Sequence, residues 1–138
     1  MMIAKTLCSA DLFAATTKGD LTAIRRRLKA GADLHAPTPL GNTVLHVAAL
    51  NGLLKVVKLL IEHGADVGAL DRFGKTALHC AARMGHQEIA ALLIDSGAGV
   101  NAQAKNGSHP LDWAIKFEHD ALGEFLRQRG GECGRSLR

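Results

Sequence analysis

The chain has 138 residues and a formal net charge of +4, from 17 Lys and Arg against 13 Asp and Glu, so it is long enough for one domain with a sizeable core. Hydrophobic residues make up 47% of the chain and aromatic residues only 4%, with no Tyr, and this balance favours helices over sheets. A charge this small, concentrated toward the two ends, disfavours a dedicated nucleic-acid binder and predicts solvated, charged caps.

The cysteines and the longest uncharged stretch exclude several classes of protein. Cys8, Cys80 and Cys133 are far apart and form no CxxC pair, so neither a disulfide framework nor a zinc site is predicted, and a reducing compartment is expected, the cytoplasm or else the nucleus. Residues 34–54 carry no Asp, Glu, Lys or Arg, but Pro, Gly, Asn and His interrupt them, which argues against a membrane span. Asp11 comes before any sustained apolar run, which argues against a signal peptide.

Three series of glycines recur at the same interval of 33 residues, the difference between 31 and 64 and between 64 and 97. The series are Gly31, Gly64 and Gly97; Gly41, Gly74 and Gly107; and Gly19, Gly52 and Gly85. Apolar residues repeat with them in two columns, Leu12, Leu45, Leu78 and Leu111, and Ala15, Ala48, Ala81 and Ala114. The period predicts one domain over 1–138 made of stacked units at about 8–36, 37–69, 70–102 and 103–135.

Each unit is predicted to hold two short helices. In the second unit they cover about Thr43–Asn51 and Lys55–His63. Gly52 allows the tight turn between them, and Gly64 ends the second helix in the left-handed conformation that only glycine adopts at low cost. One such pair buries too little apolar surface to offset its own ordering entropy. The units must therefore stack.

The residues of the second and third units resemble the ankyrin repeat. The run Gly74–Ala82, continued by Gly85–Ile89, Leu92–Ile94 and Gly97-Ala98, follows that repeat almost position by position. The similarity extends from about Asp11 to Gly131. It implies an all-α repeat solenoid, in which stacked antiparallel helix pairs are joined by β-hairpin loops that project from the stack.

The first and fourth units depart from the repeat and are interpreted as caps. In the first unit Phe13 replaces the usual His, and Arg26 and Arg27 stand in apolar columns. In the fourth unit Asp112 replaces the His and Glu118 replaces the recurring Gly. A terminal unit has a single neighbour, so polar substitutions on its outward face are what capping requires.

Two signals for chemistry each have a structural explanation. The stretch Gly68–Thr76 resembles a phosphate-binding loop, but five residues separate its glycines instead of four. The seven histidines form no metal-binding pattern, and no metal or cofactor is predicted. The resemblance implies that His46 and His79, with the preceding Thr, hydrogen bond to backbone across the hairpin and the helix start.

The remaining polar candidates are also interpreted as structural. Asp112 and Glu118 lack a nucleophile or third group in the pattern and are expected to be solvated charges. The run Arg25–Arg27 is expected on a solvated outer face, with nucleic-acid binding as the minority alternative. Cys80 is expected to be a small packing residue and not a reactive thiol.

The resemblance implies that a partner binds to the concave face, made of hairpin tips and first helices. The columns that need not repeat leave these candidate contacts: Leu40, Asn42, Leu50, Asn51, Arg72, Phe73, Lys75, Arg83, Met84, Lys105, Asn106, Lys116 and Phe117. Ser108 also remains at a loop tip. Exposed apolar residues beside Arg are typical of interface anchors, although Leu40 and Phe73 share a column and could instead pack hairpin against hairpin.

The function predicted from these features is a monomeric, non-enzymatic protein-binding module, either an adaptor or a stoichiometric inhibitor. The basic candidate contacts predict a partner with acidic character. The alternative is a structural subunit of a larger assembly. The identity of the partner is not encoded in these patterns.

Overall fold

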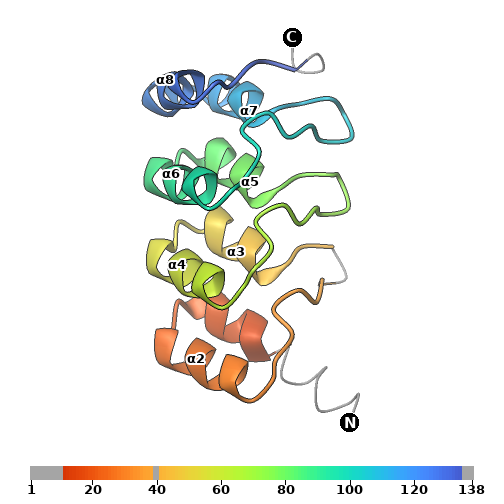
Figure 1. The fold of residues 1–138 in the computed structure, drawn as a ribbon, viewed down its shortest axis with the longest axis vertical. Helices are drawn as coiled ribbons and strands as arrows, with labels where there is room; N and C mark the ends of the chain where they lie inside the picture. Colours follow the sequence, from red (N-terminus) through yellow and green to blue (C-terminus); the bar gives the residue numbers. More distant parts are fainter. Residues whose placement is uncertain (1–10, 39–40, 135–138) are drawn as a thin grey trace.

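The structure of the protein, a computed structural model, describes residues 11–38 and 41–134. Helical residues 11–18 precede seven helices, and no strand occurs within the described ranges. The seven are α2 (Leu21–Lys29), α3 (Val44–Leu50), α4 (Leu54–Glu62), α5 (Ala77–Met84), α6 (Gln87–Asp95), α7 (Pro110–Lys116) and α8 (Asp120–Gln128). They form antiparallel pairs stacked one on another, which confirms the predicted all-α repeat solenoid (Figure 1).

The stack has two rows of helices and a row of loops. The first helices α3, α5 and α7 pack on one another, and α2, α4 and α6 form part of the second row. The loops that join successive units all extend to the same side of the stack, away from α4, α6 and α8 (Figure 1). A surface that crosses several units can therefore form on the loop side.

The core runs through the stack as the repeated columns predict. Leu12, Leu45, Leu78 and Leu111 are each at most 3% exposed, and Ala48, Ala81 and Ala114 are fully buried. The alanines, with no side chain beyond Cβ, let adjacent first helices approach closely. From the second row, Val57, Leu60 and Leu93 complete the same core.

Threonine and histidine together start the first helices of the two inner units. Thr76 caps α5 by accepting from the His79 backbone N–H, and the Thr76 N–H donates to His79 Nδ1 at 3.0 Å. Because Nδ1 accepts, the ring proton lies on Nε2, which donates to the carbonyl of Ser108 in the next unit at 3.1 Å. Thr43 and His46 repeat this arrangement, with Nε2 donating to the Lys75 carbonyl at 2.8 Å. The expected structural role of both histidines is confirmed.

A second pair of histidines links the turns between helices. His86 Nε2 lies 3.2 Å from the Leu50 carbonyl, and His119 Nε2 lies 2.8 Å from the Arg83 carbonyl. The glycines at these turns have positive φ, 72° at Gly52 and 77° at Gly85. A Cβ on Gly52 would lie 2.7 Å from the His86 ring. Glycine is needed there both for the backbone and for the ring of the next unit.

The connecting loops are tight hydrogen-bonded turns, each closed across its base by a backbone bond such as Asp71 N–H to Lys75 O at 2.9 Å. Asp71 Oδ1 accepts from the N–H groups of Phe73 and Lys75, both at 2.9 Å. One loop is tied to the next, because the Lys105 N–H donates to the Phe73 carbonyl at 2.9 Å. The implied hairpins are thus present as turns without a strand ladder in the described residues.

Two predictions for the fourth unit need correction. Asp112 is not a solvated charge: it is 5% exposed, and its Oδ2 accepts from the His109 N–H at 2.8 Å and the Gly134 N–H at 2.6 Å. Ser108 is fully buried and is no loop-tip contact. Glu118 is exposed as expected, but it holds a φ of 61°, the left-handed conformation of the glycine it replaces.

Candidate protein-binding face

Most of the predicted contact residues come together on the loop side of the stack. We call the surface formed by the following residues the loop face: Asn42, Leu50, Arg72, Phe73, Lys75, Arg83, Lys105, Asn106, Trp113, Lys116 and Phe117. Phe73 is 59% exposed and Phe117 39%. The exposure of Phe73 disagrees with the alternative in which it packs hairpin against hairpin; Leu40 lies outside the described residues.

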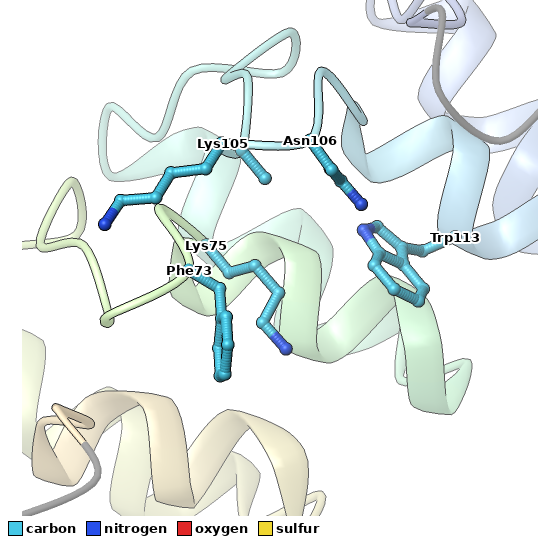
Figure 2. A pocket seen from close by; sticks show the side chains of 6 residues that line it. Phe73, Lys75, Lys105, Asn106 and Trp113 are labelled. Carbon is cyan, nitrogen blue, oxygen red and sulfur yellow. The ribbon is translucent and has the colours of Figure 1, made fainter.

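Aromatic rings on the loop face carry cationic groups above them. The Lys75 ammonium lies 5.5 Å from the centroid of Phe73 and 5.7 Å from that of Trp113. Figure 2 shows the Lys75 side chain between these two rings, which come from successive units. The Lys116 ammonium lies 5.4 Å from the Trp113 ring. Each such contact at an exposed site contributes about 0.5–1 kcal/mol.

The same arrangement continues to both ends of the face. The Arg83 guanidinium lies 5.5 Å from the Phe117 ring, and the Arg72 guanidinium 5.7 Å from the Phe73 ring. Trp113 and Phe117 stack with centroids 5.9 Å apart and planes inclined by 10°. The rings therefore hold long basic side chains in defined positions and reduce the entropy that those side chains would lose on binding.

Trp113 is fixed in orientation by a short chain of hydrogen bonds. Its indole Nε1–H donates to Ser108 Oγ at 3.1 Å, and the Ser108 hydroxyl donates to Asn106 Oδ1 at 2.6 Å. In Figure 2 the Asn106 side chain points toward the indole, whereas Lys105 extends away from it. The position of the indole is thus set by the base of the loop.

Two cavities open along the loop face and share Phe73 and Lys75. One, of about 310 Å³, is lined by those two residues with Ala104, Lys105, Asn106 and Trp113. The other, of about 260 Å³, extends toward the second unit, where Asn42, Val47 and Leu50 line it. The cavities are adjacent, because Phe73 and Lys75 line both, and together they extend over three units; we call the two together the groove. A groove of this kind suits an extended segment better than a compact small molecule.

The groove is strongly basic. Five of the loop-face residues are cations, namely Arg72, Lys75, Arg83, Lys105 and Lys116. The carboxylate beside them, Asp71, is 4% exposed at its side chain and already lies 4.0 Å from Lys75. The face therefore attracts negative charge.

Comparison with known protein families identifies the repeat. A family model described as "Ankyrin repeats (3 copies)" matches residues 12–104 and, in a second overlapping match, residues 66–136. The chain belongs to the ankyrin-repeat family. A search of curated proteins finds no relative that matches it. Ankyrin repeats are generally protein-protein interaction modules and are generally non-enzymatic.

The predicted contact residues differ in how they sit on this ankyrin stack. Eight line the groove: Asn42, Leu50, Arg72, Phe73, Lys75, Arg83, Lys105 and Asn106. Lys116 and Phe117 join it through Trp113. Met84 is 47% exposed, and Asn51 is exposed at the end of α3, but neither lines the groove. That any of them contacts a partner stays a prediction.

Sequence reasoning missed Trp113, Ala104 and Asp71 as parts of this ankyrin surface. Trp113 shares a repeat column with Val47 and with Cys80, for which a packing role is predicted. The available signal was its size, because the column holds Val and Cys in the inner units and a tryptophan would not fit the same space. Asp71 was detectable from the turn, since Asp commonly accepts from backbone N–H groups two residues ahead.

The other chemical candidates on the stack are structural. Cys80 is buried, and burial raises the pKa of its thiol to about 11, so it stays protonated. No group of His, Cys, Asp and Glu in the described ranges could hold a metal ion. None of the described helices is long and apolar enough to cross a bilayer. The Gly68–Thr76 stretch forms a hairpin turn whose end caps α5.

Proposed function

We propose that this ankyrin-repeat protein is a non-enzymatic, monomeric binding module that holds a protein partner on its loop face, as an adaptor or a stoichiometric inhibitor. In ankyrin stacks this corresponds to the concave side. The single observation that carries the proposal is the groove across three units, lined by exposed aromatic rings that hold basic side chains. Aromatic and Arg residues in such settings supply most of the binding energy in protein interfaces.

The unpaired cysteines favour an intracellular, reducing location, the cytoplasm with the nucleus as an alternative. Cys80 and Cys133 are both free thiols. Repeats with boundaries near 8–36, 37–69, 70–102 and 103–135 fit this single binding domain, and the proposal involves no cofactor.

The test is a variant that removes four exposed side chains of the third unit together: Arg72→Ala, Phe73→Ala, Arg83→Ala and Met84→Ala. All four are exposed, so the helical circular dichroism signal and the melting temperature should stay close to those of the wild type. Capture of partner proteins from a lysate of the native source should be abolished.

The matched control replaces Lys55, Lys58 and Glu62 by Ala. These residues are exposed on α4, on the side of the stack away from the loops. The control should capture the same partners as the wild type. Capture by the loop-face variant that is unchanged from the wild type would refute the proposal.

The alternative is a structural subunit of a larger assembly. The observation in its favour is the exposed basic surface of α2, which carries Arg25, Arg26 and Lys29. Size-exclusion chromatography of the native material separates the two functions. A subunit co-elutes with its assembly without added ligand, whereas a monomeric module elutes alone until its partner is supplied.

A further inference from the structure

The rings of the loop face resemble a site for cations, but their faces are already occupied. Lys75 lies over both Phe73 and Trp113, and Lys116 lies over both Trp113 and Phe117. A cationic ligand, such as a methylated lysine, would have to displace these groups from a surface that is itself positively charged. The site therefore disfavours a cationic partner.

The same coverage disfavours the stacking of nucleic-acid bases. Base stacking needs an open ring face for each base. Trp113 stacks on Phe117 with planes inclined by 10°, and ammonium groups lie over both rings. Trp113 and Phe117 therefore do not present the series of open ring faces that successive stacked bases need.

The cations can therefore pair with anions while the rings hold them in place. Of the five, Lys75 has a carboxylate within 4.0 Å, that of Asp71. The Glu118 side chain follows Phe117 at the edge of the face, in the turn between α7 and α8. The charge left over on the face is positive, and it is spread along the groove instead of concentrated at one point.

The cavity between Phe73 and Trp113 adds a requirement for an apolar side chain on the partner. Its lining is mostly apolar and consists of Phe73, Trp113 and Ala104 together with Lys75, Lys105 and Asn106. Its volume of about 310 Å³ accommodates one large side chain. Burial of such a side chain removes apolar surface from water on both partners.

We infer that the partner of the loop face presents an extended acidic segment in which one large apolar side chain is flanked by Asp or Glu. The apolar side chain enters the Phe73–Trp113 cavity, and the carboxylates pair with Lys75, Lys116 and Arg83. This inference rests on the proposed function and specifies the chemistry of the partner. Lys75 is then a specificity-determining residue, because its side chain borders the apolar cavity and its positive charge pairs with a carboxylate of the segment.

Selection from a random linear peptide library displayed on phage tests the inference, because it presumes no partner. The wild-type protein, immobilised through its N-terminus, should enrich peptides that combine Asp or Glu with a neighbouring Leu, Ile, Phe or Trp. Enrichment of neutral or basic peptides would overturn the inference.

Binding of a selected peptide without Trp can be followed directly, because Trp113 is the only tryptophan of the chain and lines the cavity. Its fluorescence should change on titration. Lys75→Gln should weaken the peptide about tenfold, and Phe73→Ala about tenfold to thirtyfold. Lys75→Arg should restore much of the affinity. Lys58→Gln, on the far side of the stack, is the matched control and should bind like the wild type.

Changes to the peptide complete the test. Replacing its Asp and Glu by Asn and Gln should reduce affinity and flatten the dependence on NaCl. Replacing its large apolar residue by Ala should weaken binding at every salt concentration. An oligothymidylate that binds tighter than the peptide would assign the face to nucleic acid and overturn the inference.

The outcomes separate the two claims. Selected peptides that are not acidic, but still lose affinity with Phe73→Ala, refute the acidic segment and leave protein binding at the loop face intact. Peptides whose affinity is unchanged by every loop-face variant refute the proposed function as well.

Discussion

The third and fourth units start their first helices with different side chains. In the third unit His79 accepts from the Thr76 N–H and donates to the Ser108 carbonyl of the next unit. In the fourth, Asp112 accepts from the His109 N–H and from Gly134, which follows α8. The acceptor at the helix start is kept in both units. The link to a later carbonyl differs: in the third unit the same His79 ring makes it, whereas in the fourth the His109 ring lies 2.9 Å from the Glu132 carbonyl. The repeated histidine therefore belongs to the interface between units as much as to its own helix.

The turns of the same two units differ for the same reason. A Cβ on Gly85 would lie 2.6 Å from the His119 ring of the next unit. Glu118 occupies the corresponding position of the fourth unit with a φ of 61°. There it is exposed, so its backbone strain is tolerated without a steric clash. A repeated residue thus reflects a contact with the neighbouring unit. The residue type is less restricted in the fourth unit, where no further unit packs against this turn in the described residues.

The largest expected effect is that of His79→Ala. It leaves the buried Thr76 N–H without a partner and removes the link to the Ser108 carbonyl of the next unit, which keeps only the Ala104 N–H. The free energy of unfolding should fall by about 3 kcal/mol. Asp112→Ala should lose only about 1–2 kcal/mol, because it removes a cap without breaking an interface between units. Urea unfolding followed by circular dichroism measures both. Equal losses would contradict the distinction between inner and terminal units.

Substitutions at Gly85 and at the corresponding Glu118 should change the stability of the fold in opposite directions. Gly85→Ala should destabilise the fold by about 2 kcal/mol, through the left-handed backbone and the displaced His119 ring. Glu118→Gly should stabilise it by up to about 1 kcal/mol, because the same conformation is free of strain in glycine. The melting temperatures of the two variants and the wild type, measured side by side, test both expectations. A Glu118→Gly protein less stable than the wild type would rule out backbone strain at that turn.

Acid should weaken the inner interface. Burial lowers the pKa of His79 below its ordinary value of 6.5, against the opposing hydrogen bond to Ser108. The unfolded chain therefore takes up a proton as the pH falls through 6.5 while the folded protein stays neutral at this ring, and stability is lost until the pH reaches the folded pKa. His79→Gln should show a shallower decline of unfolding free energy between pH 7.5 and 5.5. Parallel curves for the two proteins would exclude His79 as the source.

The smallest effect concerns reactivity alone. With the pKa of its thiol raised to about 11 by burial, Cys80 should react with iodoacetamide slowly at neutral pH in the folded protein and rapidly in urea. Cys133, half-buried near the end of the fourth unit, is the internal comparison. Peptide mapping by mass spectrometry after short labelling times reports each cysteine separately. Rapid native labelling of Cys80 would show that the inner unit opens readily.

Much of the fold follows from the period. The predicted helix Thr43–Asn51 differs from α3 by one residue at each end, because Thr43 and Asn51 are its capping residues. The exposure of Phe73, Met84 and Phe117 also agrees with the columns. These features depend on local pattern and on neighbours that repeat at a fixed interval, and a single sequence contains both.

The missed features depend on contacts that occur once. Asp112 is buried by Gly134, a partner 22 residues later that no repeat predicts. Trp113 reaches the groove because Ser108 and Asn106 hold its indole there. A column can show that a position varies, but the direction of a large side chain at that position is set by packing between units.

Both backbone polar groups of Lys75, the N–H and the carbonyl, are hydrogen-bonded. Its N–H donates to Asp71, and its carbonyl accepts from the Asp71 N–H and from His46 in the preceding unit. The backbone of the residue at the centre of the groove is therefore fixed between two inner units, and its amide proton is expected to exchange slowly. A partner meets a surface that is already formed, so association should proceed in one kinetic phase without a slow rearrangement. Differences in affinity among related partners should then appear mainly in how long each complex lasts.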